Sequence, residues 1–377
     1  QKNISMIKKE KILIKPEDIK PSTKDFEVMG TLNPGAARLP DGNIVLYVRV
    51  IEKLKNNQDK KYFFSPRCIG KTHCKLQIDK FLKTRTIENT DLDFVFGDET
   101  KRLTYISHLR KVILDKNGFD IITIDKKPSF SGVENDAELG VEDARITQIG
   151  KKYYMTYVGL SRKENISTYL AESEDCINWK RHGIIFGEQD KDVVLFPEKI
   201  QGKYLAFDRP EGNFEFSSPH IWVAYSKDLD YWGDLKALEL SNSKNKLVRT
   251  GAGPPPIKTD KGWLFIFHGV TMFEEKSLMC SIKKALGIKT EKQYSYAVWA
   301  ALLDLKDPKK ILGMTHNPIL TPNKKKHVSS EGKIVLFPTG IIEDKEHLLL
   351  YSGAGDTYTT VHKIKISDIM KNIKPVY

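Results

Sequence analysis

The 377-residue sequence contains few cysteines and no long apolar run. Its four cysteines, Cys68, Cys74, Cys176 and Cys280, are too few and too scattered to predict a disulfide framework. We therefore expect a reducing compartment and a cytoplasmic location. No stretch approaches the roughly 20 apolar residues that a membrane helix needs, so we expect no membrane partner. The first twenty residues alternate lysine with isoleucine and lack the apolar core of a secretory signal.

Several chemical motifs are also missing. The stretch Gly251–Pro256 contains a pair of glycines, but its prolines remove backbone donors, so we do not expect a nucleotide loop. No serine elbow is found. No basic run is interleaved with aromatic residues, which argues against a nucleic-acid partner. Cys68, His73 and Cys74 have no zinc spacing, and adjacent His and Cys point to opposite sides of a strand, so we expect no metal site.

Lysine and aromatic residues are plentiful. The net charge of +12 comes from lysines spread over the whole length, which is typical of a solvated surface. A general positive field also favours small anionic substrates such as phosphate. Fifteen tyrosines, seventeen phenylalanines and many short Val/Ile runs favour strands over helices.

A pattern of short strand, turn and longer apolar strand recurs five times. In the first copy, Pro40-Asp41-Gly42 supplies turn chemistry, because proline fixes φ and glycine allows positive φ. Most copies are followed by a further strand that ends in an acid-rich turn, as at Asp175 and Asp228. The copies lie at Leu39–Arg49, Ile146–Tyr157, Phe196–Arg209, Pro256–His268 and Phe337–Tyr351.

Five imperfect hairpin repeats predict an all-β fold, a five-bladed β-propeller. A sandwich accounts less well for five similar units, and a β-helix needs a more regular period. No linker divides the chain, so we expect a single domain over residues 1–377, with an N-terminal extension over about residues 1–25. Because inner propeller strands surround a channel, the charged residues at strand ends should be neighbours. These are Arg49, Arg209, His268 and Asp356.

The turn-like segment Gly140–Arg145 carries the strongest candidate for an acid, Asp143. An acid beside an arginine is often only a surface ion pair. We predict instead that Asp143 lies in a pocket and protonates a leaving oxygen, if burial raises its pKa. Arg145 is predicted to orient this acid or to bind a sugar hydroxyl. Glu142 should point away from Asp143 if the segment is extended.

Cationic and donor residues at other strand ends suit an oxyanion. Guanidinium groups bind phosphate through two parallel hydrogen bonds, which makes Arg209 and Arg249 candidates for a phosphate pocket. His268 is a further donor candidate, although a lone histidine at a strand end is more often a satisfied core residue. Ser241–Lys246 reads as a polar loop.

Motifs spanning nearly the whole chain resemble the β-mannoside phosphorylases of glycoside hydrolase family 130, in the family's order. The resemblance implies a five-bladed β-propeller, no cofactor and inorganic phosphate as co-substrate. It implies that phosphate cleaves a β-mannoside with inversion and gives α-mannose 1-phosphate. The motifs are Asn33–Ala36, Leu46–Arg49, Gly140–Arg145, Leu195–Lys199, Arg209-Pro210, Gly251–Pro256, His268–Val270, Leu303–Pro308 and Gly353–Asp356.

The resemblance also implies residue roles. Asp143 matches the catalytic acid, which acts by way of a mannose hydroxyl. The family's phosphate-binding positions are matched by Lys191, Arg209, Arg249 and His268, and its mannose-binding positions by Asn33, Arg49 and Asp356. Lys191-Asp192 stands where the family often has Arg-Asn, and an Asp192 that faced phosphate would repel it.

Three functions stay open at this point. The first is a phosphorylase of β-mannosides, with β-1,2-oligomannosides as the first expectation and synthesis as a possible direction. The second is an inverting β-mannosidase that uses water. The third is a propeller that binds glycans without turnover. The partners expected are a small mannoside and phosphate, and the oligomeric state, including a homo-oligomer, is left open.

Overall fold

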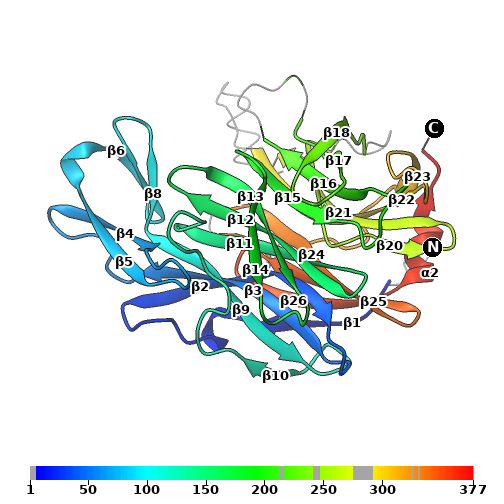
Figure 1. The fold of residues 1–377 in the computed structure, drawn as a ribbon, viewed down its shortest axis with the longest axis horizontal. Coiled ribbons are helices and arrows are strands. Elements are labelled where there is room, and N and C mark those ends of the chain that lie inside the picture. Colours follow the sequence, from blue (N-terminus) through cyan, green and yellow to red (C-terminus); the bar gives the residue numbers. More distant parts are fainter. Residues whose placement is uncertain are drawn as a thin grey trace.

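The computed structural model describes residues 6–211, 216, 218–240, 247–274, 292–323, 326–329 and 332–376, and its regular secondary structure is nearly all β-strand (Figure 1). The strands form antiparallel runs, each named here by its first strand. The β2 run is β2 (Phe26–Arg38), β3 (Ile44–Leu54), β9 (Tyr105–Leu114) and β10 (Ile121–Ile124). The β11 run is β11 (Gly140–Ile149), β12 (Lys152–Ser161), β13 (Asn165–Ser173) and β14 (Lys180–Phe186).

The remaining runs follow in chain order. The β15 run is β15 (Asp190–Leu195), β16 (Tyr204–Pro210), β17 (Trp222–Ser226) and β18 (Trp232–Ala237). The β19 run is β19 (Arg249–Ala252), β21 (Gly262–Glu274), β22 (Lys292–Leu303) and β23 (Ile311–Thr315), with β20 (Ile257–Thr259) also on β21. The β24 run is β24 (Ile334–Asp344), β25 (His347–Ala354), β26 (Tyr358–Lys365) and β1 (Ile7–Ile14).

Four short elements lie outside these runs. These are two 3-10 turns, Pro16–Asp18 and Lys83–Arg85, the helix α2 (Ile366–Asn372) and the strand β27 (Ile373–Lys374). No helix in the described ranges is long and apolar enough to cross a membrane. The strand β1 lies within the predicted N-terminal extension, where it pairs with β26 and buries Leu13 and Ile14.

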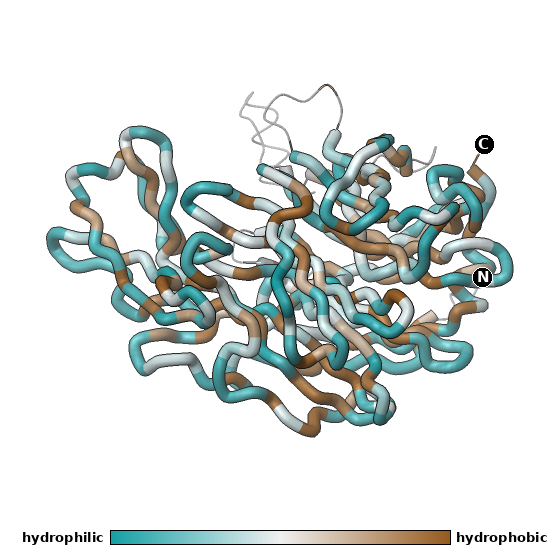
Figure 2. The backbone as a smooth tube through the Cα atoms, in the orientation of Figure 1, coloured by the Kyte–Doolittle hydropathy of each residue, from teal (hydrophilic) through white to brown (hydrophobic). Residues whose placement is uncertain are grey.

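Apolar clusters between neighbouring runs close them into a ring. Each cluster takes side chains from two runs, because strands in the middle of a run bury residues on both faces. Figure 2 shows these strands as brown stretches between teal loops. One pair represents each junction in order: Tyr47 with Tyr153, Leu170 with Ala206, Phe207 with Phe265, Leu264 with Leu350, and Leu349 with Leu46. The architecture is therefore an all-β, propeller-like ring.

The predicted acid-rich turns recur at equivalent places. The carboxylate of Asp175 accepts the backbone N–H groups of Ile177 and Asn178 at 2.9 and 2.8 Å. Asp228 accepts two such bonds after β17, and Asp304 accepts two after β22. Each turn fixes the exit from a strand, since an aspartate side chain replaces a backbone acceptor.

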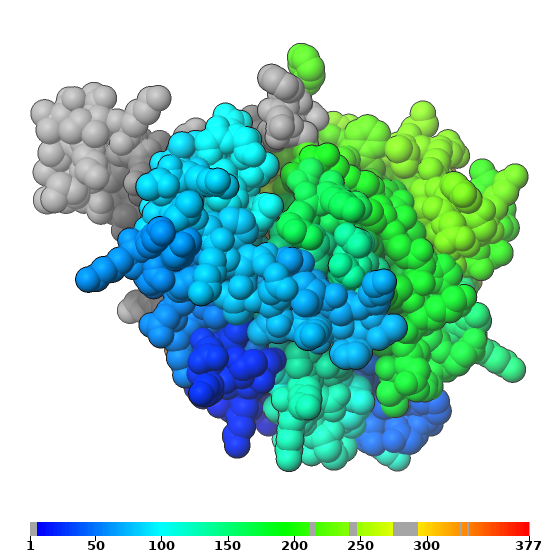
Figure 3. Space-filling model, turned by 60° about the vertical axis from the view of Figure 1, so that its left-hand side comes forward, coloured from blue at the N-terminus to red at the C-terminus, as the bar shows by residue number. Residues whose placement is uncertain are grey.

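An arm of short strands interrupts the β2 run between β3 and β9. It contains β4 (Tyr62–Cys68), β5 (Leu76–Leu82), β6 (Thr86–Asn89), β7 (Asp93–Phe96) and β8 (Lys101–Leu103). The arm projects from the body in Figure 1 and forms the blue-to-cyan lobe in Figure 3. Its own small core is aromatic, with Phe94 against Phe63, Phe81 and Phe96.

The arm also corrects the prediction about cysteines. Cys68 and Cys74 form a disulfide, because the chain turns back after β4 and Ile69 donates its N–H to the carbonyl of Lys75 at 2.9 Å. The sequence analysis predicted no disulfide framework and did not anticipate this single bridge, so the predicted cytoplasmic location loses one of its grounds. Cys176 is buried and free, while Cys280 and the predicted loop Ser241–Lys246 lie outside the described residues.

Candidate active site

A cavity of about 510 Å³ lies at one end of the first strands of the runs. The predicted convergence of distant strand ends is confirmed, because residues from every run line this one cavity. Eight of the nine predicted site residues are among them. They are Asn33 from β2, Arg49 from β3, Asp143 from β11, Lys191 from β15, Arg209 from β16, Arg249 from β19, His268 from β21 and Asp356 after β25.

Four residues of this cavity adopt left-handed backbone conformations. The φ angles are +46° at Asn33, +51° at Asp143, +57° at Asp192 and +50° at Asp356. The first three lie at register shifts in β2, β11 and β15, where the inner strand bulges against its neighbour. Asparagine and aspartate tolerate this conformation better than most residues, and such strain clusters at functional sites. The bulges turn these polar side chains towards one place.

One half of the cavity is organised around Arg49. Its Nη1 donates to Oδ1 of Asp143 at 3.1 Å, and its Nη2 donates to Oε1 of Glu142 at 2.6 Å. The amide of Asn33 donates to the same Oδ1 of Asp143 at 2.9 Å. Both bonds to Asp143 end on Oδ1, so within the described chain Oδ2 keeps no partner. Ser107 adds a bond of 3.3 Å to Glu142.

The prediction that Glu142 points away from Asp143 was wrong. In an extended strand adjacent side chains alternate, but the bulge between Glu142 and Arg145 breaks that alternation. Both carboxylates therefore reach Arg49 and line the cavity. The pairing raises the pKa of the Arg49 guanidinium. Burial alone would lower this pKa, but the negative charges of Glu142 and Asp143 outweigh the effect of burial.

The other half of the cavity rests on Asp192. Its carboxylate is almost completely buried and accepts bonds from Arg209 Nε at 2.8 Å and from Arg145 Nη2 at 2.9 Å. Burial alone would raise the pKa of Asp192, but Arg209, His268 and Arg145 together hold it well below its usual range. Asp192 is thus an ionised anchor beneath the cationic side chains.

Arg145 does not line the cavity. It is 1% exposed, and besides Asp192 it binds the carbonyls of Gly253 and Ala252, each at 2.9 Å. Its remaining bond goes to the carbonyl of Asp143 at 3.3 Å. The guanidinium therefore ties the acid's backbone to the β19 strand and to Asp192, in place of the predicted contact with a sugar hydroxyl.

Arg209 and Arg249 meet on a single carboxylate. Glu211 Oε1 accepts Nη1 of Arg249 at 2.6 Å and also binds Nη1 of Arg209. With Asp192 on its Nε, Arg209 has two of its three nitrogens engaged by acids. The ammonium of Lys191 lines the cavity and makes neither a hydrogen bond nor an ion pair within the described residues. It is therefore available to bind an anionic ligand.

His268 is a neutral donor rather than a cation. It is 1% exposed, and burial lowers its pKa to about 3, although Asp192 partly opposes this effect. Neither ring nitrogen has a hydrogen-bond partner among the described protein atoms, and the same holds for Oδ1 of Asn33 and Nε of Arg49. Buried polar atoms are rarely left unpaired, because each costs about 1–3 kcal/mol. Such atoms on both sides of one cavity indicate a polar ligand.

Two glycines of the sequence motifs make room for this arrangement. A Cβ on Gly353 would lie 2.0 Å from Oδ1 of Asn33. A Cβ on Gly251 would lie 2.2 Å from the His268 ring and 2.4 Å from Oδ2 of Asp192. Side chains at these positions would displace residues on both halves of the cavity, so the glycines belong to the site.

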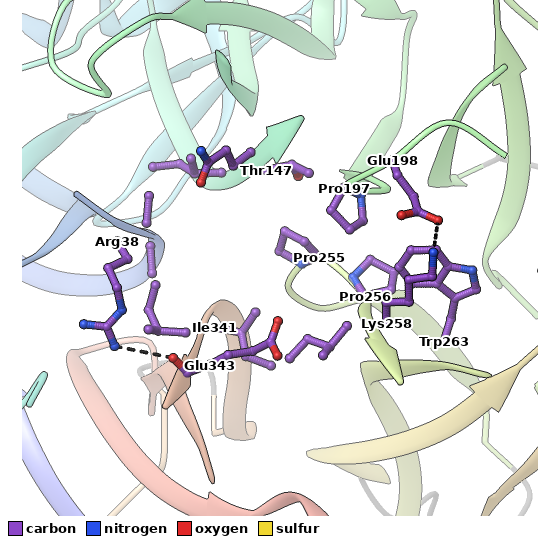
Figure 4. A pocket seen from close by; sticks show the side chains of 16 residues that line it. Arg38, Thr147, Pro197, Glu198, Pro255, Pro256, Lys258, Trp263, Ile341 and Glu343 are labelled. Atoms are coloured by element: carbon purple, nitrogen blue, oxygen red, sulfur yellow. Dashed lines mark hydrogen bonds and ion pairs between the residues drawn. The ribbon is translucent and has the colours of Figure 1, made fainter. Parts of the chain in front are cut away.

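A second cavity, of about 480 Å³, lies at the opposite ends of the same first strands (Figure 4). Three of its charged side chains have protein partners: Glu198 pairs with Lys258 at 2.6 Å, and Arg38 binds the carbonyls of Gly42 and Glu343. None of the buried unpartnered side-chain atoms of the described chain lies there. We therefore take the first cavity as the candidate active site.

Sequence reasoning missed several residues in and behind this cavity. Glu142 was dismissed and Asp192 was noted only as a departure, although both line the cavity. Glu211, which binds Arg209 and Arg249 from behind the lining, was not considered. The available signal was an Asn or Asp shortly before each of three repeats, a residue type that tolerates the left-handed backbone of a bulge. Leu92 of the arm and Tyr105, which begins β9 directly after the arm, also line the cavity. Nothing in the sequence pattern marked either residue as part of a site.

The chain is similar to several known proteins. A family model described as beta-1,4-mannooligosaccharide phosphorylase matches residues 113–375. A beta-1,2-mannobiose phosphorylase of Listeria innocua is 32% identical over 378 residues, which cover 96% of each chain. A 1,2-beta-oligomannan phosphorylase of Thermoanaerobacter sp. is 34% identical over 280 residues, which cover 72% of this chain and 83% of that one.

A solved structure shows the same similarity in three dimensions. The Listeria innocua beta-1,2-mannobiose phosphorylase, in complex with beta-1,2-mannobiose, superposes with a TM-score of 0.79 and 31% identity over 96% of both chains. The similarity therefore includes the fold and nearly the whole length.

Proposed function

Because this chain belongs to glycoside hydrolase family 130, we propose that it is a phosphorylase that cleaves β-mannosides with inorganic phosphate. The reaction inverts the anomeric centre and gives α-mannose 1-phosphate. Relatives that share about a third of their residues are named for β-1,2-mannobiose and β-1,2-oligomannan, so β-1,2-linked mannosides are the proposed substrates. The observation that carries the proposal is one cavity in which Asp143 stands opposite Lys191, Arg209 and Arg249.

Asp143 is proposed as the catalytic acid. Asn33 and Arg49 hold its Oδ1, which leaves Oδ2 to deliver a proton to the glycosidic oxygen by way of a mannose hydroxyl. Orientation of this kind matters, because proton transfer needs donor and acceptor within hydrogen-bond reach. Asp356 and the unpaired Oδ1 of Asn33 are proposed to bind the hydroxyls of the mannose unit.

Phosphate is proposed to bind the other half of the cavity. Lys191, the remaining nitrogens of Arg209 and Arg249, and the neutral His268 together offer charge and donors to its oxygens. They would hold the nucleophile below the anomeric carbon, and such positioning supplies much of the rate in a bimolecular reaction. The reaction balances without a metal or an organic cofactor. The same groups would also run it in the synthetic direction.

A hydrolase is the second candidate. To use water as the nucleophile, it would need a base carboxylate roughly 6.5–9.5 Å from the acid. Asp192 is the carboxylate that lines the cavity on the phosphate side. Although burial alone would raise its pKa, Arg209, His268 and Arg145 hold that pKa well below the usual range. A carboxylate of this kind is a weak base. This supports phosphate as the nucleophile.

We also propose that the ring has five blades, one for each antiparallel run. The β2, β11, β15, β19 and β24 runs would each be a blade, with the first strand of each at the axis. Support comes from the two cavities, which lie at opposite ends of the same first strands. In this arrangement β1 completes the last blade.

The experiment is incubation of purified protein with β-1,2-mannobiose, with and without phosphate. Formation of α-mannose 1-phosphate that requires phosphate is the expected result. Free mannose as sole product in both reactions would establish the hydrolase instead. No turnover, together with mannobiose binding by calorimetry, would leave a glycan-binding protein.

A further inference from the structure

Glu211 binds two arginines that come from different strands. Its Oε1 accepts Arg249 Nη1 at 2.6 Å and is also bound by Arg209 Nη1. Its backbone N–H donates to the carbonyl of Gln189 at 2.8 Å, which holds the residue beside the end of β16. One carboxylate oxygen therefore sits between two guanidinium groups, as an oxygen of a bound oxyanion would.

The charges explain why a carboxylate lies there. Arg209 and Arg249 carry like charges and would repel each other without an anion between them. Burial opposes ionisation of Glu211, but these two arginines outweigh burial and hold its pKa below the ordinary value. Glu211 is therefore charged at neutral pH and neutralises the pair.

Glu211 and Asp192 hold Arg209 in different ways. The side chain of Asp192 is 4% exposed and is also bound by Arg145, so its removal would leave a buried charge. The side chain of Glu211 is 23% exposed, and its second partner Arg249 is 35% exposed. Glu211 is therefore the less buried of the two carboxylates, and its displacement would leave less buried charge than the displacement of Asp192.

We propose that Glu211 is a placeholder anion: it occupies Arg209 and Arg249 in the empty enzyme and competes with phosphate for them. Glu211 is then a residue that sets the affinity for phosphate. The proposal rests on the proposed function, because it assigns phosphate to these arginines. The carboxylate weakens phosphate binding, by competition and by like charge, while it keeps the arginines in place.

The test is Glu211→Gln, which keeps the shape and an acceptor oxygen but removes the charge. We expect the KM and the Kd for phosphate to fall by about 5-fold or more, while the KM for mannobiose changes little. Phosphate should also raise the Tm of the variant more than that of the wild type. Glu198→Gln is the matched control, because Glu198 also pairs with a cation but lies at the other cavity.

Unchanged or weaker phosphate binding in Glu211→Gln would overturn the proposal. If that variant fails to fold, Glu211→Asp is measured instead, since the shorter chain withdraws the carboxylate from Arg249; no tighter binding would again overturn it. Calorimetric titration with inorganic phosphate separates this result from the proposed function. A wild type that releases free mannose without phosphate refutes phosphorolysis, whereas phosphorolysis with unaltered phosphate affinity in the variant refutes only the role of Glu211.

Discussion

The side-chain amide of Asn33 donates a hydrogen bond of 2.9 Å to Oδ1 of Asp143, a residue 110 positions further along the chain. Arg49 binds the same oxygen at 3.1 Å. The orientation of the acid thus depends on a neighbouring run of strands. Asn33 and Asp143 both have a left-handed backbone where their side chains meet. Changes that disturb this contact should affect turnover before they affect the fold.

Asp143→Asn should lower kcat by about 10²–10⁴-fold, the usual contribution of a general acid. Asparagine is nearly isosteric and still accepts bonds at Oδ1, so the Tm should stay close to that of the wild type. Turnover is measured as formation of α-mannose 1-phosphate, and folding by thermal unfolding. A variant with more than a tenth of the wild-type kcat would contradict the assignment of the acid.

Gly353→Ala should reduce activity by displacing Asn33. The added Cβ would lie 2.0 Å from Oδ1 of Asn33, so the side chain must move and the structure should lose about 1–3 kcal/mol of stability. Activity and chemical unfolding measure the two effects. Gly187→Ala is the control, because a Cβ there meets nothing within 4 Å. Wild-type activity in Gly353→Ala would show that the contact with Asn33 is dispensable.

Lys191→Ala should raise the KM for phosphate by about 10–100-fold and leave the KM for mannobiose nearly unchanged, since a charge-assisted bond of this kind is worth about 1.5–3 kcal/mol. The Tm should not fall, because Lys191 makes no ion pair in the described structure. Initial rates over a matrix of both substrate concentrations provide the measurement. Equal changes in the two KM values would count against a role in phosphate binding.

Asp190 and Asp208 predict a pH dependence of stability. The two carboxyl groups are buried on the paired strands β15 and β16. Burial raises the pKa of both, and the charge of Asp208 raises that of Asp190 further. The folded protein therefore retains a proton that the unfolded chain releases. This contribution is fully present below the ordinary aspartate pKa of about 3.9 and is lost as the pH rises through the raised values.

Asp190→Asn should flatten that dependence, because an amide cannot lose a proton. Between pH 5 and pH 8 the Tm of the wild type should decline more than that of the variant, by an amount equivalent to on the order of 1–3 kcal/mol. Thermal unfolding in matched buffers is the measurement. Parallel Tm profiles for the two proteins would refute the raised pKa.

The repeats and the convergence of strand ends were predictable from sequence. Apolar hairpins with turn residues at similar offsets report local structure, and a ring of them brings their ends together whatever the details of register. For this reason Arg49, Arg209, His268 and Asp356 were expected as neighbours and do line one cavity.

The side-chain directions were less accessible. A bulge reverses the alternation of a strand, so Glu142 was expected to point away from Asp143 and instead shares Arg49 with it. The arm between β3 and β9 and the disulfide from Cys68 to Cys74 depend on loop closure, which residue type alone does not determine. Ion pairs such as Glu211 with Arg249 depend on contacts between runs and are invisible to local pattern.

The strand β1 pairs with β26, with Lys11 opposite Val361. During synthesis, β1 must therefore wait until β26, which lies far along the chain, has been made before it finds its partner. Until then the backbone donors and acceptors of both strands remain open to any other extended chain. Shortening the protein at this strand would thus favour self-association of half-closed molecules rather than a smaller working enzyme.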